Sequence, residues 1–159
     1  MLKLNNDNYF SPEANREYMS VSQYKDFWNC EAKALAKLSG EYEETEKECF
    51  IEGHFLHAWN EGKLEEFKDN NPDMYSSRGA TKGQLKSNYK HCEKMIEVLE
   101  TDPIALEVLK GQKEVIFTAE LFGVPWKIMI DSYRPEKKVF ADLKTIKSMD
   151  GRFWDNERK

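Results

Sequence analysis

Two short apolar segments near the end of the chain constrain its fold more than any other feature. Residues 124–133 and 138–143 are rich in β-branched and aromatic side chains, and the segment 134–137 between them contains a proline and is typical of a turn. The pattern predicts a β-hairpin. Asp131 and Asp142 would then lie on neighbouring strands.

The spacing of the second acid to a lysine adds a chemical constraint. Asp142 and Lys144 are two residues apart, so the period of a strand places both on one face and Leu143 on the other. Mg²⁺ prefers oxygen ligands and is often held by one or two carboxylates. A neighbouring lysine can orient an attacking water and stabilise developing negative charge. Because an isolated acid–x–lysine motif is more often a solvated ion pair, the interpretation needs support from elsewhere in the chain.

That support comes from a glycine and a histidine in a helix predicted from about Glu43 to Asn60. Gly53 lies one turn before His57 on the same helix face. A glycine inside a helix costs about 1 kcal/mol relative to alanine, which indicates close approach of another backbone or a ligand. The alternative is a packing glycine beside a histidine that forms ordinary hydrogen bonds.

In this order, the Gly53–His57 motif, Asp131 and the Asp142–Lys144 motif resemble the RecB-like branch of the PD-(D/E)xK nucleases, and most closely the exodeoxyribonuclease VIII family of prophage recombination exonucleases. Further similar segments extend over most of the chain: 19–24, 79–83, 109–114 and 123–127. The resemblance implies an α/β (α+β) fold with a restriction-endonuclease-like core. In it, helices cover a small mixed sheet within one domain spanning residues 1–159.

One family feature is missing. A Q-x-x-x-Y motif would follow Thr145, but the glutamines of the chain lie at positions 23, 84 and 112. We therefore expect either a piece of a longer nuclease, truncated at its C-terminus, or a natural short form whose catalytic competence is in question.

The resemblance also implies roles for individual residues. The metal ligands would be His57, Asp131, Asp142 and Leu143, with Mg²⁺ or Mn²⁺ as the ion, and His57 could instead hold the scissile phosphate. Lys144 would assist the nucleophilic water. Glu114 resembles a further catalytic acid before the first core strand, although Glu120 is a nearby competitor.

The charge of the chain bears on nucleic-acid binding. A net charge of -5 is unfavourable for DNA, since lysine and arginine contacts to phosphate supply most of the affinity. Two groups of residues could offset it locally. One is a stripe on a predicted helix face that consists of Lys82, Lys86 and Lys90. The other is a cluster at the Asp142–Lys144 motif that consists of Lys144, Lys147 and Arg152, and Thr145 beside it is a further candidate for a contact to DNA. An ordinary solvated helix face is an equal alternative for the stripe.

Three classes of function remain after these observations. The first, from the resemblance, is a metal-dependent DNA exonuclease that acts on linear duplex ends in phage or prophage recombination. It would pass single strands to an annealing protein, and it could form a homo-oligomer. The second is a catalytically incomplete homologue that acts as a DNA- or protein-binding module. The third, hydrolysis of a small phosphate compound, ranks last because the sequence contains no glycine-rich nucleotide loop.

Cysteine and histidine usage argues against other cofactors. Cys30, Cys49 and Cys92 contain no C-x-x-C pattern, so neither a disulfide framework nor a zinc knuckle is predicted, and no iron–sulfur cluster is expected. His54 and His57 could form half of a zinc site but have no third ligand near them in sequence. No apolar run approaches the roughly 20 residues that span a bilayer, and no secretory signal is evident, so we expect a cytoplasmic location and no membrane partner.

Overall fold

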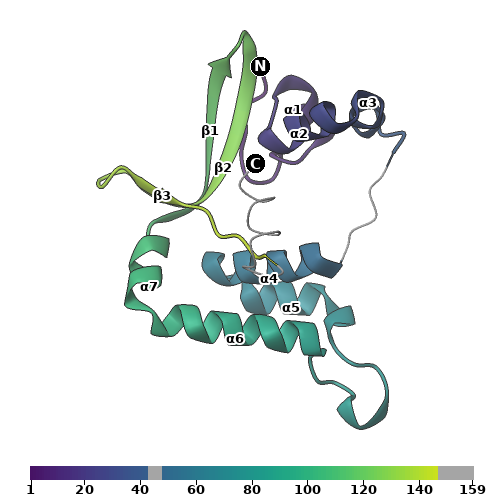
Figure 1. The fold of residues 1–159 in the computed structure, drawn as a ribbon, viewed down its shortest axis with the longest axis vertical. Coiled ribbons are helices and arrows are strands. Elements are labelled where there is room, and N and C mark those ends of the chain that lie inside the picture. The colour runs from purple at the N-terminus through teal and green to yellow at the C-terminus, as the bar shows by residue number, and fades with distance from the viewer. Residues whose placement is uncertain (43–47, 147–159) are drawn as a thin grey trace. The chain divides into compact units, whose positions relative to one another are not determined.

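The computed structural model describes residues 1–42 and 48–146, and side chains 48–50 are not described. The chain divides into two compact units, Met1–Glu46 with Lys110–Phe140 and Lys47–Leu109 with Ala141–Lys159. The described elements, shown in Figure 1, are α1 (Pro12–Glu17), α2 (Val21–Asn29), α3 (Glu31–Ser39), α4 (Glu48–Glu61), α5 (Leu64–Asn70), the 3₁₀ turns η1 (Pro72–Met74) and η2 (Gly79–Thr81), α6 (Ser87–Thr101), α7 (Pro103–Leu109), β1 (Gln112–Leu121), β2 (Val124–Arg134) and β3 (Val139–Ala141). This combination of helices and one small sheet confirms the predicted fold class.

The sheet has the strand order β1–β2–β3. β1 and β2 are antiparallel, with Leu121 opposite Val124 at one end and Gln112 opposite Tyr133 at the other. The two-residue turn between them, Phe122–Gly123, has φ angles of 56° and 71°. Positive φ at both positions defines the turn geometry that matches the twist of a tight hairpin, although asparagine and glycine adopt it more easily than phenylalanine.

The hairpin predicted from the sequence is the connection from β2 to β3. Its turn is closed by two backbone hydrogen bonds, in which Lys137 N–H donates to the Arg134 carbonyl and Lys138 N–H to the Pro135 carbonyl. Met19, which lies outside the named strands, forms a single isolated parallel bridge with Trp126 of β2. The small sheet expected from the sequence is therefore present, but its strands are antiparallel rather than mixed, because one bridge does not add a parallel strand.

The helices of the first unit begin and end where local chemistry dictates. The sequence predicts one helix that begins at a Ser20 or Ser22 cap, runs to about Leu38 and ends at Ser39–Gly40. Ser20 is the cap of α2, because it forms a reciprocal capping box with Gln23. The prediction of one continuous helix is wrong. The backbone at Cys30 is extended and separates α2 from α3. As predicted, α3 ends before a glycine, since Gly40 adopts the left-handed conformation that closes a helix.

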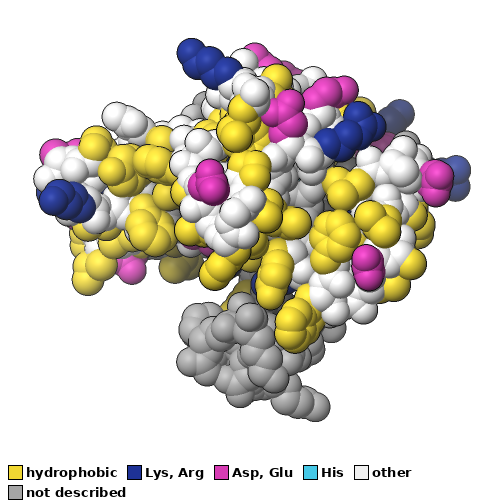
Figure 2. All heavy atoms as spheres, turned by 90° about the horizontal axis from the view of Figure 1, so that it is seen from above, with side chains coloured by type: hydrophobic (Ala, Val, Ile, Leu, Met, Phe, Trp, Pro, Cys, Tyr) yellow, Lys and Arg dark blue, Asp and Glu magenta, His cyan; other side chains and the backbone are white. Residues whose placement is uncertain are grey.

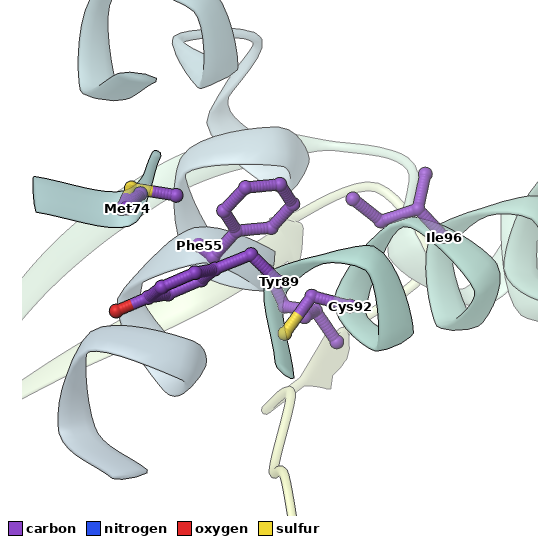
Figure 3. Close-up of a cluster of buried hydrophobic side chains, with 6 residues drawn as sticks. Phe55, Met74, Tyr89, Cys92 and Ile96 are labelled. Carbon is purple, nitrogen blue, oxygen red and sulfur yellow. The ribbon is translucent and has the colours of Figure 1, made fainter. Parts of the chain in front are cut away.

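The second unit is built around a hydrophobic core formed mainly by α4 and α6. Figure 3 shows Phe55 from α4 beside Tyr89 from α6, and their ring centroids are 6.2 Å apart. The buried cluster also contains Leu56, Met74, Cys92 and Ile96. Removing one such large core side chain typically costs about 3–5 kcal/mol, so this cluster determines the position of α4.

The surface is not uniformly polar. Figure 2 shows hydrophobic side chains on much of one face, and several large ones are strongly exposed: Phe10, Trp28, Ile104, Phe122 and Phe140. No helix among the described residues is long and apolar enough to cross a bilayer.

Candidate active site

Two of the predicted site acids, Asp131 and Glu114, lie within the first unit. Lys113 pairs with Ser132 and Val115 with Ile130, which places Glu114 of β1 and Asp131 of β2 opposite each other between these pairs. A carboxylate oxygen of Glu114 lies within 4.8 Å of one of Asp131. Glu120, the competing candidate, is opposite Pro125 near the far end of the hairpin. The structure therefore places Glu114, and not Glu120, beside Asp131.

The environment of this pair is unusual for two acids. Asp131 is only 6% exposed, and Glu114 has a φ of 51°, a conformation that residues other than glycine seldom adopt. Buried carboxylates are costly unless other groups compensate their charge. Backbone strain of this kind is concentrated at functional sites, so the pair is a reasonable candidate for a ligand set.

Two neighbouring residues that no sequence motif indicates complete the polar cluster. Lys113 Nζ donates a hydrogen bond of 2.9 Å to Ser132 Oγ, and Ser132 is 1% exposed. Burial lowers the pKa of Lys113, and the nearby negative charge of Asp131 counteracts only part of this lowering. Lys113 precedes Glu114 and Ser132 follows Asp131 in the sequence. This adjacency to two predicted acids, rather than a motif, is the sequence feature that indicates them.

The acid–x–lysine motif lies in the second unit, directly after β3. Asp142 and Lys144 form an ion pair at 3.0 Å, with 43% and 69% of their side chains exposed. Leu143 packs against the Phe55 core cluster. The alternation predicted from the sequence is therefore present, with the two charged groups on one side and the leucine on the other. Asp142 and Lys144 themselves follow the strand, since β3 ends at Ala141.

The predicted glycine–histidine motif lies on α4 of the same unit. A Cβ atom at Gly53 would lie 3.4 Å from Thr145 Oγ1, an ordinary van der Waals distance, so α4 lies beside the segment that carries Asp142 and Lys144. Half-buried His57 lines a cavity of about 250 Å³ together with His54 and Glu61. The neighbour of Gly53 is thus a side chain at ordinary contact distance and not the closely approaching backbone or ligand that the sequence predicts, and the role of His57 stays a prediction.

The predicted basic stripe has a different local structure. Helix α6 begins at Ser87, so Lys82 and Lys86 precede it and only Lys90 lies within it. The prediction of a continuous helical stripe is wrong, because Lys86 has the extended backbone of a helix cap and Lys82 follows the η2 turn. All three lysines are exposed. Lys147 and Arg152 lie outside the described residues.

Comparisons with known proteins assign the chain to a family. Residues 20–159 match the family model described as "PDDEXK-like domain of unknown function (DUF3799)". The chain is similar to a protein from Eubacterium rectale whose crystal structure is named "Putative exonuclease". The two sequences are 36% identical, and the two structures align with a TM-score of 0.80 over 99% of this chain. The chain spans 64% of the length of that protein. A search of curated proteins gave no match.

The chain therefore belongs to this family of PDDEXK-like domains, because the family model matches most of its length. The predicted PD-(D/E)xK superfamily and the restriction-endonuclease-like fold are both confirmed. The finer assignment to the exodeoxyribonuclease VIII family stays a prediction.

Proposed function

We propose that the chain is a metal-dependent DNA exonuclease domain that hydrolyses phosphodiester bonds. The observation that supports this most is the buried Asp131 beside Glu114, in a chain with a PDDEXK-like fold. Two carboxylates this close repel each other unless a cation or a proton compensates their charge. Their oxygen atoms suit Mg²⁺ or Mn²⁺, which prefer such ligands.

Each proposed residue has a defined role. Asp131 and Glu114 would supply carboxylate oxygens to the ion, and the family resemblance implies Asp142 and Leu143 as further ligands, the latter through its backbone carbonyl. A bound divalent ion would lower the pKa of a coordinated water and stabilise negative charge on the phosphate. His57 would hold either the ion or the scissile phosphate, and Lys144 would orient the attacking water.

The substrate class comes from the resemblance and from the name of the E. rectale protein, which describes an exonuclease. We propose linear duplex ends as the substrate, in phage or prophage recombination in the cytoplasm. A single-strand annealing protein and further copies of the chain are proposed partners. The exposed Lys82, Lys86 and Lys90 are candidates for contacts to DNA phosphates.

Digestion of a linear duplex labelled at either the 5′ or the 3′ end tests this proposal. We expect the wild-type protein to shorten the duplex with Mg²⁺ or Mn²⁺ but not with EDTA, and the two labels report the polarity. Asp142→Ala should abolish cleavage, whereas Asp73→Ala, a change at an exposed acid of η1, should not. Undiminished cleavage by Asp142→Ala would contradict the assignment.

A second candidate function is a non-catalytic binding module. The observation that favours it is the exposed Asp142–Lys144 ion pair, because two groups in such a pair can simply be solvated partners. In this case the protein would bind duplex DNA or a protein partner. Binding would slow the DNA in a gel, but the DNA would not be shortened with any added metal ion. A gel-shift experiment run beside the digestion distinguishes the two functions.

A further inference from the structure

The first unit contains a cavity that the proposed nuclease chemistry does not use. It has a volume of about 410 Å³ and is lined by residues of the N-terminal segment and α1–α3, together with Lys127 of β2. Pockets of about 300–1,000 Å³ typically bind small organic molecules. Its walls include the aromatic side chains of Tyr9, Phe10 and Phe27.

A buried lysine lines this cavity. Lys127 is 3% exposed, and its ammonium donates to the Tyr9 carbonyl at 2.5 Å and to Asn15 Oδ1 at 2.7 Å. It also lies over the Tyr9 ring, 4.7 Å from the centroid. These acceptors are neutral, and burial lowers the pKa of Lys127. An ammonium has three N–H donors, so one donor remains beyond these two hydrogen bonds.

The charges around the cavity favour an anion. Three cationic side chains, Arg16, Lys37 and Lys127, line it together with one acid, Asp26. Asp26 already pairs with Lys37 at 2.9 Å. The chain as a whole carries a net charge of -5, so this positive lining stands out against an acidic protein. Clustered charge of one sign in a cleft attracts ligands of the opposite sign.

We propose that this cavity binds a nucleoside monophosphate unit, with its phosphate held by Lys127 and Arg16 and its base against Tyr9 and Phe27. The choice of a nucleotide rests on the proposed function, whereas the anion-binding character rests on the cavity alone. The unit can be a free mononucleotide or the terminal nucleotide of a DNA strand. Lys127 and Asp131 are four residues apart in β2, about 13 Å along a strand, so a strand end is within reach of the acidic pair.

Isothermal titration calorimetry in EDTA tests this proposal without any cleavage. We expect dTMP to bind the wild-type protein, inorganic phosphate to bind more weakly, and thymidine not to bind. Arg16→Gln and Lys127→Met should each weaken dTMP binding about tenfold or more, since each removes a hydrogen-bonding charge. Lys25→Gln, at an exposed lysine of α2 outside the cavity, should bind like the wild type.

If Lys127→Met fails to fold, Arg16→Gln still tests the proposal, because Arg16 is exposed and its substitution should not disturb the fold. Two results would overturn the proposal: no binding of dTMP or of a 5′-phosphorylated oligonucleotide at millimolar concentration, or wild-type affinity for both in Arg16→Gln. Tighter binding of the oligonucleotide that Arg16→Gln weakens identifies a strand end as the occupant of the cavity, and tighter binding of dTMP identifies the free nucleotide. Because EDTA removes metal, binding here is independent of whether the protein cleaves DNA.

Discussion

The polar groups of the two units differ in how the fold surrounds them. In the first unit, Asp131 and Ser132 are 6% and 1% exposed and lie within a hydrogen-bonded sheet. In the second, the side chains of Asp142 and Lys144 are 43% and 69% exposed, and they follow the last strand. The first set is part of the folded interior, whereas the second is exposed on either side of Leu143, which packs against the Phe55 cluster.

This difference separates stability from chemistry. A buried polar cluster contributes to the folded state, so its mutation should change both the free energy of unfolding and activity. A solvated ion pair contributes little to stability, typically about 0–1 kcal/mol, so its mutation should change activity alone. Mutations in the buried cluster and in the exposed ion pair should therefore differ in their effect on stability, although both should reduce the proposed cleavage.

The largest effect is expected for Asp131→Ala. Cleavage should fall by at least about 10²–10³-fold, the loss typical of one preorganised electrostatic group. The free energy of unfolding should also fall, by about 1–3 kcal/mol, because Lys113 loses a nearby opposite charge. Steady-state digestion and urea unfolding measure the two quantities. Glu120→Ala, at an exposed acid on the same hairpin, is the control, and a stability of Asp131→Ala equal to that of the wild type would break the comparison.

Asp142→Ala should match the loss of cleavage but not the loss of stability. The exposed pair with Lys144 predicts a change in the free energy of unfolding within about 0.5 kcal/mol. The same digestion and unfolding experiments apply. A clear destabilisation would show that this segment is as integral to the fold as the sheet.

Two glycines sharpen the comparison at the level of the backbone. A Cβ atom at Gly111 in the first unit would lie 2.5 Å from the Tyr133 carbonyl oxygen, and its φ is +128°, so Gly111→Ala should destabilise by about 3 kcal/mol. At Gly53 the corresponding distance to Thr145 Oγ1 is 3.4 Å. The alanine side chain of Gly53→Ala should fit, and the free energy of unfolding should rise by up to about 1 kcal/mol, because alanine has a higher helix propensity than glycine. Thermal unfolding of both variants checks the sign of each change, and equal effects would refute it.

The smallest effect concerns the cysteines. Burial raises the pKa of Cys92 to about 11, whereas Cys30 is exposed. Since the thiolate is the reactive form, Cys92 should remain unlabelled by a thiol reagent at pH 8 while Cys30 reacts. Labelling followed by mass spectrometry, on a Cys49→Ser background, measures this. Rapid labelling of Cys92 in the folded protein would show that the core around Phe55 opens readily.

Local patterns predicted the parts of the fold that depend on local chemistry. The β2–β3 turn, the Ser20 cap, the Gly40 helix end and the alternation around Leu143 follow from residue types and spacing. The break at Cys30 is not predictable in this way, because a continuous helical composition does not show where the backbone leaves the helix. The lysine stripe failed similarly, since a four-residue spacing carries meaning only within a helix, and α6 starts at Ser87.

The candidate site was predictable in part. Asp131, Asp142 and Lys144 are candidates because their motif spacing is visible along the chain, and their roles stay predictions. Choosing Glu114 over Glu120 required the β1–β2 register, which pairs residues distant in sequence. The polar link between Lys113 and Ser132, and the burial of Lys127 beside Tyr9, also depend on tertiary contacts that no local pattern encodes.

Titration of Mn²⁺ into the wild-type and Asp131→Asn proteins tests most directly whether the acidic pair of β1 and β2 holds a divalent ion. Asparagine keeps the shape of the side chain and removes its charge, so folding can be checked independently by circular dichroism. We predict measurable Mn²⁺ binding by the wild type and a loss of at least about tenfold in affinity for Asp131→Asn. Equal affinity in two folded proteins would contradict a metal role for this pair.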